Sequence, residues 1–270
     1  MNLKNKLRLF TFNLLGQKNV DKLRYIKFKH KFNKFLRFRD KNIFVKRFSE
    51  FYEPEMAIIP KILHDPRVII DIGANYGPYS FFLSKLYPKA RIFAFEPATR
   101  SYSILKKIIK RFNLANVISV KKGLGAKEER KEIVMPLQYT ILAYISAQNV
   151  KKGDKDVSEE IEITTLDNFV KRNKIKRIDF IKCDVEGFEL NVLKGAKKSI
   201  KKFKPIVFIE IEERHTQKYE IKPQQVYNFF RKLGYNCYSV KKDNPEKTDI
   251  IIKETPLYLF VHKRTKITNS

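Results

Sequence analysis

The chain is 270 residues long and strongly basic, with 57 Lys or Arg against 29 Asp or Glu and a formal net charge of +28 at pH 7. This length is sufficient for one α/β domain with an extension, and no apolar run approaches the roughly 20 residues that a membrane-spanning helix needs. The two cysteines, Cys183 and Cys237, offer neither a disulfide framework nor a spaced pair of metal ligands, so we expect a cytoplasmic protein. The carboxylates around residues 210–213 could hold a divalent metal, but this set of ligands is not diagnostic and we assign no metal.

The first 50 residues are rich in basic and aromatic side chains, with 15 Lys or Arg, three acids and eight phenylalanines. Two sets of apolar residues recur there at helical spacing: Leu3, Leu7, Phe10 and Leu14, then Tyr25, Phe28, Phe32 and Phe35. Such helices could lie peripherally on the anionic inner surface of a membrane or bind a phosphate backbone. Alternatively, the aromatic stripe packs against the rest of the protein. We divide the chain into a basic extension, residues 1–50, and a domain, residues 51–270.

The first predicted strand, residues 68–71, ends in an acidic turn that contains two glycines. Its three β-branched residues do not alternate with polar ones, which is typical of a central parallel strand covered on both faces. Ligands bind at the carboxyl ends of such strands, and glycines let the backbone turn tightly there. The candidate cofactor-binding residues in this turn are Asp71, Gly73, Ala74, Asn75 and Gly77.

Two kinds of cofactor compete for this turn. A dinucleotide site would have the spacing G-x-G-x-x-G, whereas this chain has Gly73-x-x-x-Gly77. The carboxylate of Asp71 would repel a pyrophosphate and attract an ammonium or sulfonium group, and S-adenosylmethionine carries both cations. The turn could also merely join a strand to a helix.

The second predicted strand, residues 91–96, ends at Glu96 and Pro97. A carboxylate at this position can accept hydrogen bonds from both hydroxyls of a ribose. Glu96 therefore indicates an adenosine-containing cofactor in general, and does not distinguish a dinucleotide from S-adenosylmethionine. The alternative is a carboxylate that only caps the next helix.

The remaining pattern alternates strands with helices, which predicts βαβ units and a mostly parallel sheet with an antiparallel C-terminal strand. Further strands are expected at residues 117–122, 178–184, 205–212, 236–241 and 256–262. Helices are expected at residues 78–87, 99–113, 166–173, 188–200 and 223–233, and residues 241–255 form a polar excursion.

Five segments together resemble the FkbM family of S-adenosylmethionine-dependent methyltransferases, over roughly residues 50–263. They are Val68–Ser80, Phe95–Pro97, Thr164–Phe169, Lys182–Glu189 and Ile209–His215, and Asp184–Glu189 is the most specific of them. The resemblance implies a Rossmann-like, seven-strand class I methyltransferase fold, S-adenosylmethionine as cofactor, and O-methylation of a sugar or another hydroxyl-bearing small molecule.

The chain departs from this family at two places that bear on the ligands. Gly125 and Ala126 stand where the family often has Ser and Asp that hold adenine, so a side-chain hydrogen bond is missing there. Residues 136–148, with Tyr139, Tyr144 and Ser146, correspond to the family's variable stretch near the acceptor.

Three residues are candidates for catalysis. His215 follows the fifth parallel strand and is the leading base, because an imidazole can accept a proton at neutral pH; a surface or capping role is the alternative. Glu186 could accept a proton or orient the acceptor, and Asp184 is expected to border the methionine end of the cofactor. Glu210 is also notable, because an acid in an apolar strand is costly to bury unpaired.

These observations predict a methyltransferase acting on a hydroxyl of a sugar, glycan or glycolipid precursor. Two alternatives remain at this stage. One is an RNA-directed methyltransferase that uses the positive charge. The other is a non-catalytic protein that binds the cofactor or serves as a membrane adaptor.

Overall fold

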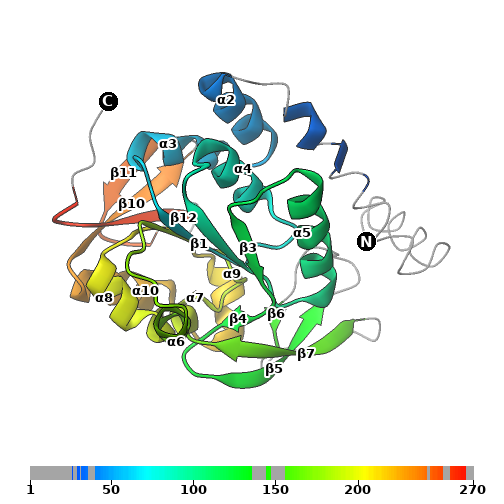
Figure 1. Ribbon diagram of the computed structural model, residues 1–270. Coiled ribbons are helices and arrows are strands. Elements are labelled where there is room, and N and C mark those ends of the chain that lie inside the picture. Colours follow the sequence, from blue (N-terminus) through cyan, green and yellow to red (C-terminus); the bar gives the residue numbers. More distant parts are fainter. Residues whose placement is uncertain are drawn as a thin grey trace, which may run out of the picture.

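The computed structural model describes residues 26, 29–30, 32–35, 40–135, 144–146, 156–241, 244–251 and 256–265. Its centre is an eight-stranded mixed sheet with the strand order β11-β10-β12-β9-β8-β1-β2-β3, flanked by helices (Figure 1). The fold is therefore α/β and Rossmann-like, as expected. The sheet has one strand more than the seven predicted.

The parallel part of the sheet consists of five strands, which are buried almost throughout except for the edge strand β3. They are β1 (Val68–Ile72), β2 (Arg91–Phe95), β3 (Val117–Val120), β8 (Phe180–Cys183) and β9 (Ile206–Glu210). Because β1 lies between β2 and β8, its side chains alternate between the two helical layers: Ile69 belongs to one hydrophobic cluster and Ile70 to the other. The continuous apolar run at 68–70 thus reflects burial on both faces.

The other part of the sheet is antiparallel. Strand β12 (Leu257–His262) lies between β9 and β10 (Tyr235–Lys241), and both neighbours run opposite to it. The additional strand is β11 (Asn244–Thr248), which pairs with β10 in a hairpin. It lies within the polar excursion, where the lack of apolar alternation gave no sign of a strand.

Helices cover both faces of the large sheet. On one face lie α4 (Pro78–Leu86) and α5 (Thr99–Arg111), and on the other lie α6 (Leu166–Arg172), α7 (Glu189–Gly195), α8 (Lys197–Phe203) and α10 (Pro223–Lys232). Shorter helical segments include α3 (Ile59–Ile62), α9 (Glu213–Thr216) and the 3₁₀ helix η2 (Gln217–Tyr219). The single helix expected at 188–200 is divided at Ala196, which has a non-helical backbone conformation.

A second sheet, made of four strands, was not predicted. Its order is β4-β7-β5-β6, with β4 (Gly123–Leu124), β5 (Glu129–Met135), β6 (Tyr144–Ile145) and β7 (Val157–Thr164). The predicted strand 117–122 therefore ends early, at Val120, and the chain continues into the small sheet. A signal was present, because Ile161 and Ile163 alternate with polar residues.

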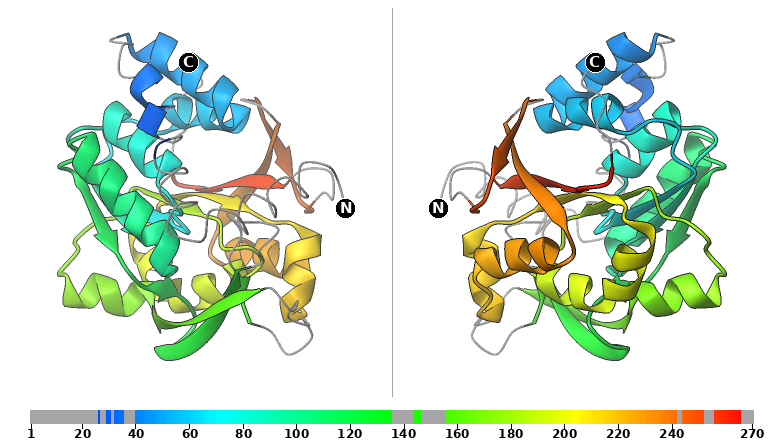
Figure 2. Two further views of the ribbon diagram at one scale, coloured as in Figure 1. Left: turned by 90° about the vertical axis from the view of Figure 1, so that its right-hand side faces the viewer. Right: turned by 90° about the vertical axis from the view of Figure 1, so that its left-hand side faces the viewer.

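The described part of the N-terminal region packs into the core. Helix α2 (Lys41–Phe51) and the 3₁₀ helix η1 (Pro54–Ile58) lie at the opposite end of the molecule from the small sheet (Figure 2). Phe32 and Phe48 are fully buried, and the ring of Phe32 stacks on that of Phe81 with centroids 4.5 Å apart. Phe35 is buried as well. The other expected stripe residues, Tyr25, Phe28, Leu3, Leu7, Phe10 and Leu14, lie outside the described residues.

Within the ranges given above, none of the helices combines the length and the apolar character needed to cross a membrane.

Candidate active site

A cavity of about 310 Å³ lies at the carboxyl ends of β1, β2, β8 and β9 and is closed on one side by the small sheet. Its position is the one at which parallel α/β sheets bind ligands, and its volume is in the range of small-molecule sites. Seven of the predicted site residues line it: Gly73, Ala74, Asn75, Glu96, Pro97, Asp184 and Glu186. Asp71, Gly77 and His215 do not.

The turn after β1 is shaped by close backbone contacts. The N–H groups of Gly73 and Ala74 both donate to the carbonyl of Phe95, at 3.0 and 2.9 Å. Gly73 has a φ of +75°, and a Cβ there would lie 1.8 Å from the carbonyl oxygen of Asp184. Only glycine therefore allows the ends of β1 and β8 to approach this closely. Gly77, with a φ of +94°, directly precedes α4 and allows the chain to turn into this helix, but it does not line the cavity.

Asp71 lies behind the turn, and its side chain is fully buried beneath α4. The Oγ atom of Ser80 donates to its Oδ2 at 2.6 Å, and in the sheet Asp71 stands in register with Lys182. Burial raises the pKa of Asp71, while Lys182 and the hydroxyl of Ser80 oppose that rise. Asp71 does not line the cavity, so the expected direct contact between its carboxylate and a cationic ligand is absent. The carboxylate instead stabilises the charge of Lys182.

Glu96 holds the turn and faces the cavity. Its Oε2 accepts the N–H of Asn75 at 2.8 Å, and its Oε1 accepts the N–H of Ala98 at 2.9 Å. Burial raises the pKa of Glu96 to about 7, against the effect of these two hydrogen bonds. Each carboxylate oxygen retains a second lone pair, so Glu96 can still accept hydrogen bonds from a ligand.

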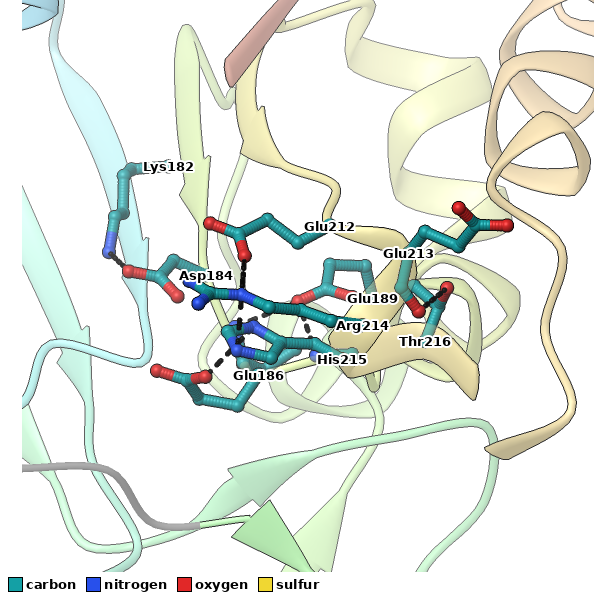
Figure 3. A network of polar contacts seen from close by, with 11 residues as sticks. Lys182, Asp184, Glu186, Glu189, Glu212, Glu213, Arg214, His215 and Thr216 are labelled. Carbon is teal, nitrogen blue, oxygen red and sulfur yellow. Dashed lines mark hydrogen bonds and ion pairs between the residues drawn. The ribbon is translucent and has the colours of Figure 1, made fainter. Parts of the chain in front are cut away.

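Lys182 is the buried cation at the other end of the cavity. Its Nζ lies 3.0 Å from Oδ2 of Asp184 and 4.7 Å from the centre of the Tyr79 ring (Figure 3 shows the ion pair). The hydroxyl of Tyr79 donates in turn to Glu53, which also lines the cavity. Burial opposes the charge of Lys182, but Asp184, Asp71 and Glu53 together raise its pKa.

Glu210, the last residue of β9, forms a hydrogen bond with Asp184 between their carboxyl groups. Burial and the nearby charge of Asp184 raise the pKa of Glu210. Burial would also raise the pKa of Asp184, but Lys182 and the hydrogen bond from Glu210 lower it. The two shifts have opposite directions, so the pair favours a proton on Glu210 and the negative charge on Asp184.

His215 lies behind Glu186 as seen from the cavity. Its Nδ1 is 3.0 Å from Oε2 of Glu186 and its Nε2 is 3.9 Å from Oε2 of Glu212, so the imidazole sits between two carboxylates (Figure 3). The Arg214 guanidinium contacts the same Glu212. The predicted leading base therefore lies behind Glu186, where it can orient this carboxylate, and Glu186 is the one of the two that lines the cavity.

The loop that carries Glu186 is tightly fixed. Glu186 has a φ of +56°, and a Cβ at Gly187 would lie 2.2 Å from the carbonyl oxygen of His215. Oε1 of Glu189 accepts the N–H groups of both Val185 and Gly187 at 3.1 Å. Within the segment Asp184–Glu189, Gly187 and Glu189 therefore serve to hold the loop in this conformation.

Sequence reasoning did not assign Glu53, Tyr79 or Lys182 to the site. Lys182 lies in one of the five segments that resemble the family, but the surrounding sequence predicts only that it is part of a strand. Nothing in the sequence near Glu53 indicates a site residue. The small sheet adds apolar walls from Leu124, Ile133 and Ile161.

The structure also gives the reason for Gly125. A Cβ there would lie 2.8 Å from Cγ2 of Ile163, because the small sheet and the ring of Phe188 pack against this backbone. A side chain at residue 125 would therefore require Ile163 to move.

In the variable stretch, Ile145 lines the cavity beside Tyr144 and Ser146, whereas Tyr139 lies outside the described residues. Among the described residues, no group of three or more His, Cys, Asp or Glu side chains has the arrangement of a metal site.

The cavity fits an adenosine cofactor that carries a positive charge. Apolar walls lie near β4, β5 and β7, Glu96 stands at the end of β2, and the acids Asp184, Glu186 and Glu210 gather at the ends of β8 and β9. These are respectively suited to a flat base, to ribose hydroxyls and to a cation.

Comparison with known proteins bears on the family. A profile described as "Methyltransferase FkbM domain" matches residues 71–237. Methyltransferase 1 of Beauveria bassiana is 27% identical over 146 residues, which cover 48% of this chain and 59% of that protein. Methyltransferase sdnD of Sordaria araneosa is 30% identical over 156 residues, covering 47% and 59%. Hexuronic acid methyltransferase AglP of Haloferax volcanii is 28% identical over 144 residues, covering 53% and 55%.

The matched region spans little more than half the length of each of these three relatives. Among solved structures, Methyltransferase FkbM from Methylobacillus flagellatus KT shares 17% sequence identity and a TM-score of 0.48, over 90% of this chain and 60% of that chain. The profile covers more than half of the present sequence, including the turn after β1 and the Asp184–Glu189 loop. The chain belongs to the FkbM family of S-adenosylmethionine-dependent methyltransferases.

Proposed function

We propose that this protein transfers the methyl group of S-adenosylmethionine to a hydroxyl of a sugar, glycan or glycolipid precursor. The observation that carries the proposal is the distribution of carboxylates along one cavity. Glu96 stands at the adenosine end, and Asp184, Glu186 and Glu210 stand at the reacting end.

The residues of this chain would hold the donor in four places. Glu96 accepts the ribose hydroxyls, and the backbone of residues 73–75 follows the methionine part. Leu124, Ile133 and Ile161 enclose the base, and Asp184 balances the positive charge. When bound, S-adenosylmethionine supplies a methyl group attached to a sulfonium, which is a strong electrophile.

Catalysis then depends on alignment and on removal of one proton. The acceptor oxygen forms its bond to the methyl carbon as the carbon–sulfur bond breaks, and that electron pair remains on sulfur. A carboxylate of the cavity takes the hydroxyl proton. Alignment can lower the barrier by several kcal/mol, on the order of 7 or more in favourable cases, and a positioned base adds about 10²-fold to 10⁴-fold.

We assign Glu186 to contact with the acceptor and His215 to the positioning of Glu186. This follows from the lining of the cavity and the 3.0 Å contact between the two side chains. Asp184 serves the cofactor and the charge balance of the reacting end.

The choice of a hydroxyl rests on charge. Glu53, Asp184, Glu186 and Glu210 surround the reacting end, and Lys182 is already paired with Asp184. A carboxylate acceptor would meet repulsion there, whereas a neutral hydroxyl would not. The relative named as a hexuronic acid methyltransferase supports a sugar-containing acceptor; because a hexuronic acid carries a carboxylate as well as hydroxyls, the choice of the hydroxyl rests on the charge of the cavity alone.

A cytoplasmic site of action remains part of the proposal, and the two buried, unpaired cysteines support it. A peripheral contact with an anionic membrane is a further proposal that rests on the net charge of +28. Phe32, Phe35 and Phe48 do not serve it, because their rings are buried in the core.

The experiment is incubation of the protein with methyl-labelled S-adenosylmethionine and fractionated cell extract. Label in a glycan or glycolipid fraction supports the proposal. The variant Glu96→Ala should lose cofactor binding and labelling, while Glu160→Ala, on the exposed face of β7, should match the wild type. Label in RNA, lost at high salt, would favour the RNA alternative suggested by the net charge. Absence of cofactor binding would exclude the enzymatic function.

A further inference from the structure

The reacting end of the cavity contains more negative charge than it can hold ionised. Asp184 and Glu210 line the same cavity at the ends of the neighbouring strands β8 and β9 and are joined by a side-chain hydrogen bond, and Nζ of Lys182 lies 3.0 Å from Oδ2 of Asp184. Lys182 also balances Asp71 and Glu53, so a single buried ammonium serves several carboxylates.

The groups around Glu210 come from every element packed near it. Lys182 and Asp184 belong to β8 and its end, Glu186 belongs to the loop that follows, Tyr79 to α4 and Arg214 to α9. The facing position on β12 is the apolar Leu257. Of these groups only Lys182 is a buried cation, since Arg214 is exposed and already contacts Glu212.

We propose that the positive charge of the bound methyl donor displaces the proton shared by Asp184 and Glu210, and that Glu210 then accepts the proton of the acceptor hydroxyl. This inference rests on the proposed function. A sulfonium beside Asp184 supplies the second positive charge that would let both carboxylates ionise together. Glu210 is then an ionised base in the same cavity as the acceptor.

The proton balance closes over one turnover. Donor binding releases one proton from Glu210 to solvent. Methyl transfer moves one proton from the acceptor hydroxyl to Glu210, while the carbon–sulfur bond breaks and its electrons remain on the sulfur of the neutral thioether product. Glu210 again donates to Asp184, which is the arrangement in the ligand-free protein. The neutral product S-adenosylhomocysteine should therefore bind without displacing this proton.

The test is calorimetric titration of the full-length protein in buffers that differ in ionisation enthalpy. A pH of about 8 is suitable because it lies above the pKa of about 7 of Glu96. The number of protons released is compared between S-adenosylmethionine and S-adenosylhomocysteine. The two ligands share their base, ribose and amino acid, so these parts cancel once the α-amino titration of each free ligand, which the sulfonium shifts, is measured at the same pH and subtracted.

We expect the donor to release close to one proton more than the product in the wild type. In Glu210→Gln this difference should vanish while both ligands still bind, because the amide can donate to Asp184 but has no proton to lose. The exposed variant Glu246→Gln on β11 should keep the full difference. A single-turnover assay should show a loss of about 10²-fold or more in the methyl transfer rate of Glu210→Gln.

Equal proton release by both ligands in the wild type would overturn the inference, and this comparison needs no variant to fold. A difference that persists in Glu210→Gln would overturn it as well. If neither ligand binds, the proposed function fails and the inference fails with it. Binding of both ligands with equal proton release would leave the methyltransferase function standing.

Discussion

Two buried glutamates of the site differ in how their oxygens are used. Glu96 accepts one backbone N–H with each oxygen, so an amide nitrogen at either position would face a donor. Glu189 accepts both of its backbone N–H groups through Oε1 alone, and its Oε2 has no hydrogen-bond partner among the described residues. An amide can therefore replace the carboxylate of Glu189 without losing a bond, which it cannot do at Glu96.

This difference gives a prediction for Glu189→Gln. Burial raises the pKa of Glu189 from 4.5 to about 7, so the folded protein keeps a proton that the unfolded chain loses over that range. The free energy of unfolding therefore falls as pH rises from 4.5 to 7, by at most about 1.4 kcal/mol per pH unit from this group. Urea unfolding at a series of pH values should show a shallower fall in the variant. Parallel curves for the two proteins would contradict the assignment.

At the scale of elements, helix α2 contributes to the core although it lies in the basic extension. Phe48 is fully buried and its ring stacks on those of Phe81 and Phe82, whereas Phe51 in the same helix is 46% exposed. We expect Phe48→Ala to lower the free energy of unfolding by about 3–5 kcal/mol and Phe51→Ala by much less. Denaturant unfolding of the two variants measures both. A neutral Phe48→Ala would mean that α2 is dispensable for the fold.

The contact between α7 and the small sheet depends on a pair of glycines. A Cβ at Gly195 would lie 1.9 Å from the carbonyl oxygen of Gly125. Gly195→Ala should therefore force the helix and the small sheet apart, at about 1–3 kcal/mol of stability, and weaken cofactor binding, because Leu124 beside this contact lines the cavity. Lys194→Ala, an exposed neighbour, should change stability by less than about 0.5 kcal/mol. Equal behaviour of the two variants in unfolding and in calorimetry would refute this.

At the scale of the whole molecule, the sequence predicts the large sheet and much of the cavity wall. Its central strands are recognisable because residues 68–70 and their counterparts are apolar without alternation, and Glu96 and Asp184 follow two of these strands directly. Glu53 was not predictable in the same way, because its place at the site results from packing against Tyr79, far away in the sequence. His215 was assigned by its chemistry, but only the fold of α9 shows that two carboxylates enclose it.

The strand β11, which was not predicted, forms one edge of the large sheet. An open sheet edge is a template on which another chain can add a strand. Strand β11 occupies that edge with Pro245, which has no N–H to offer, and with the exposed charged residues Glu246 and Lys247. Strand β11 therefore disfavours the addition of a second copy's strand at this edge of the large sheet, whose opposite edge is β3.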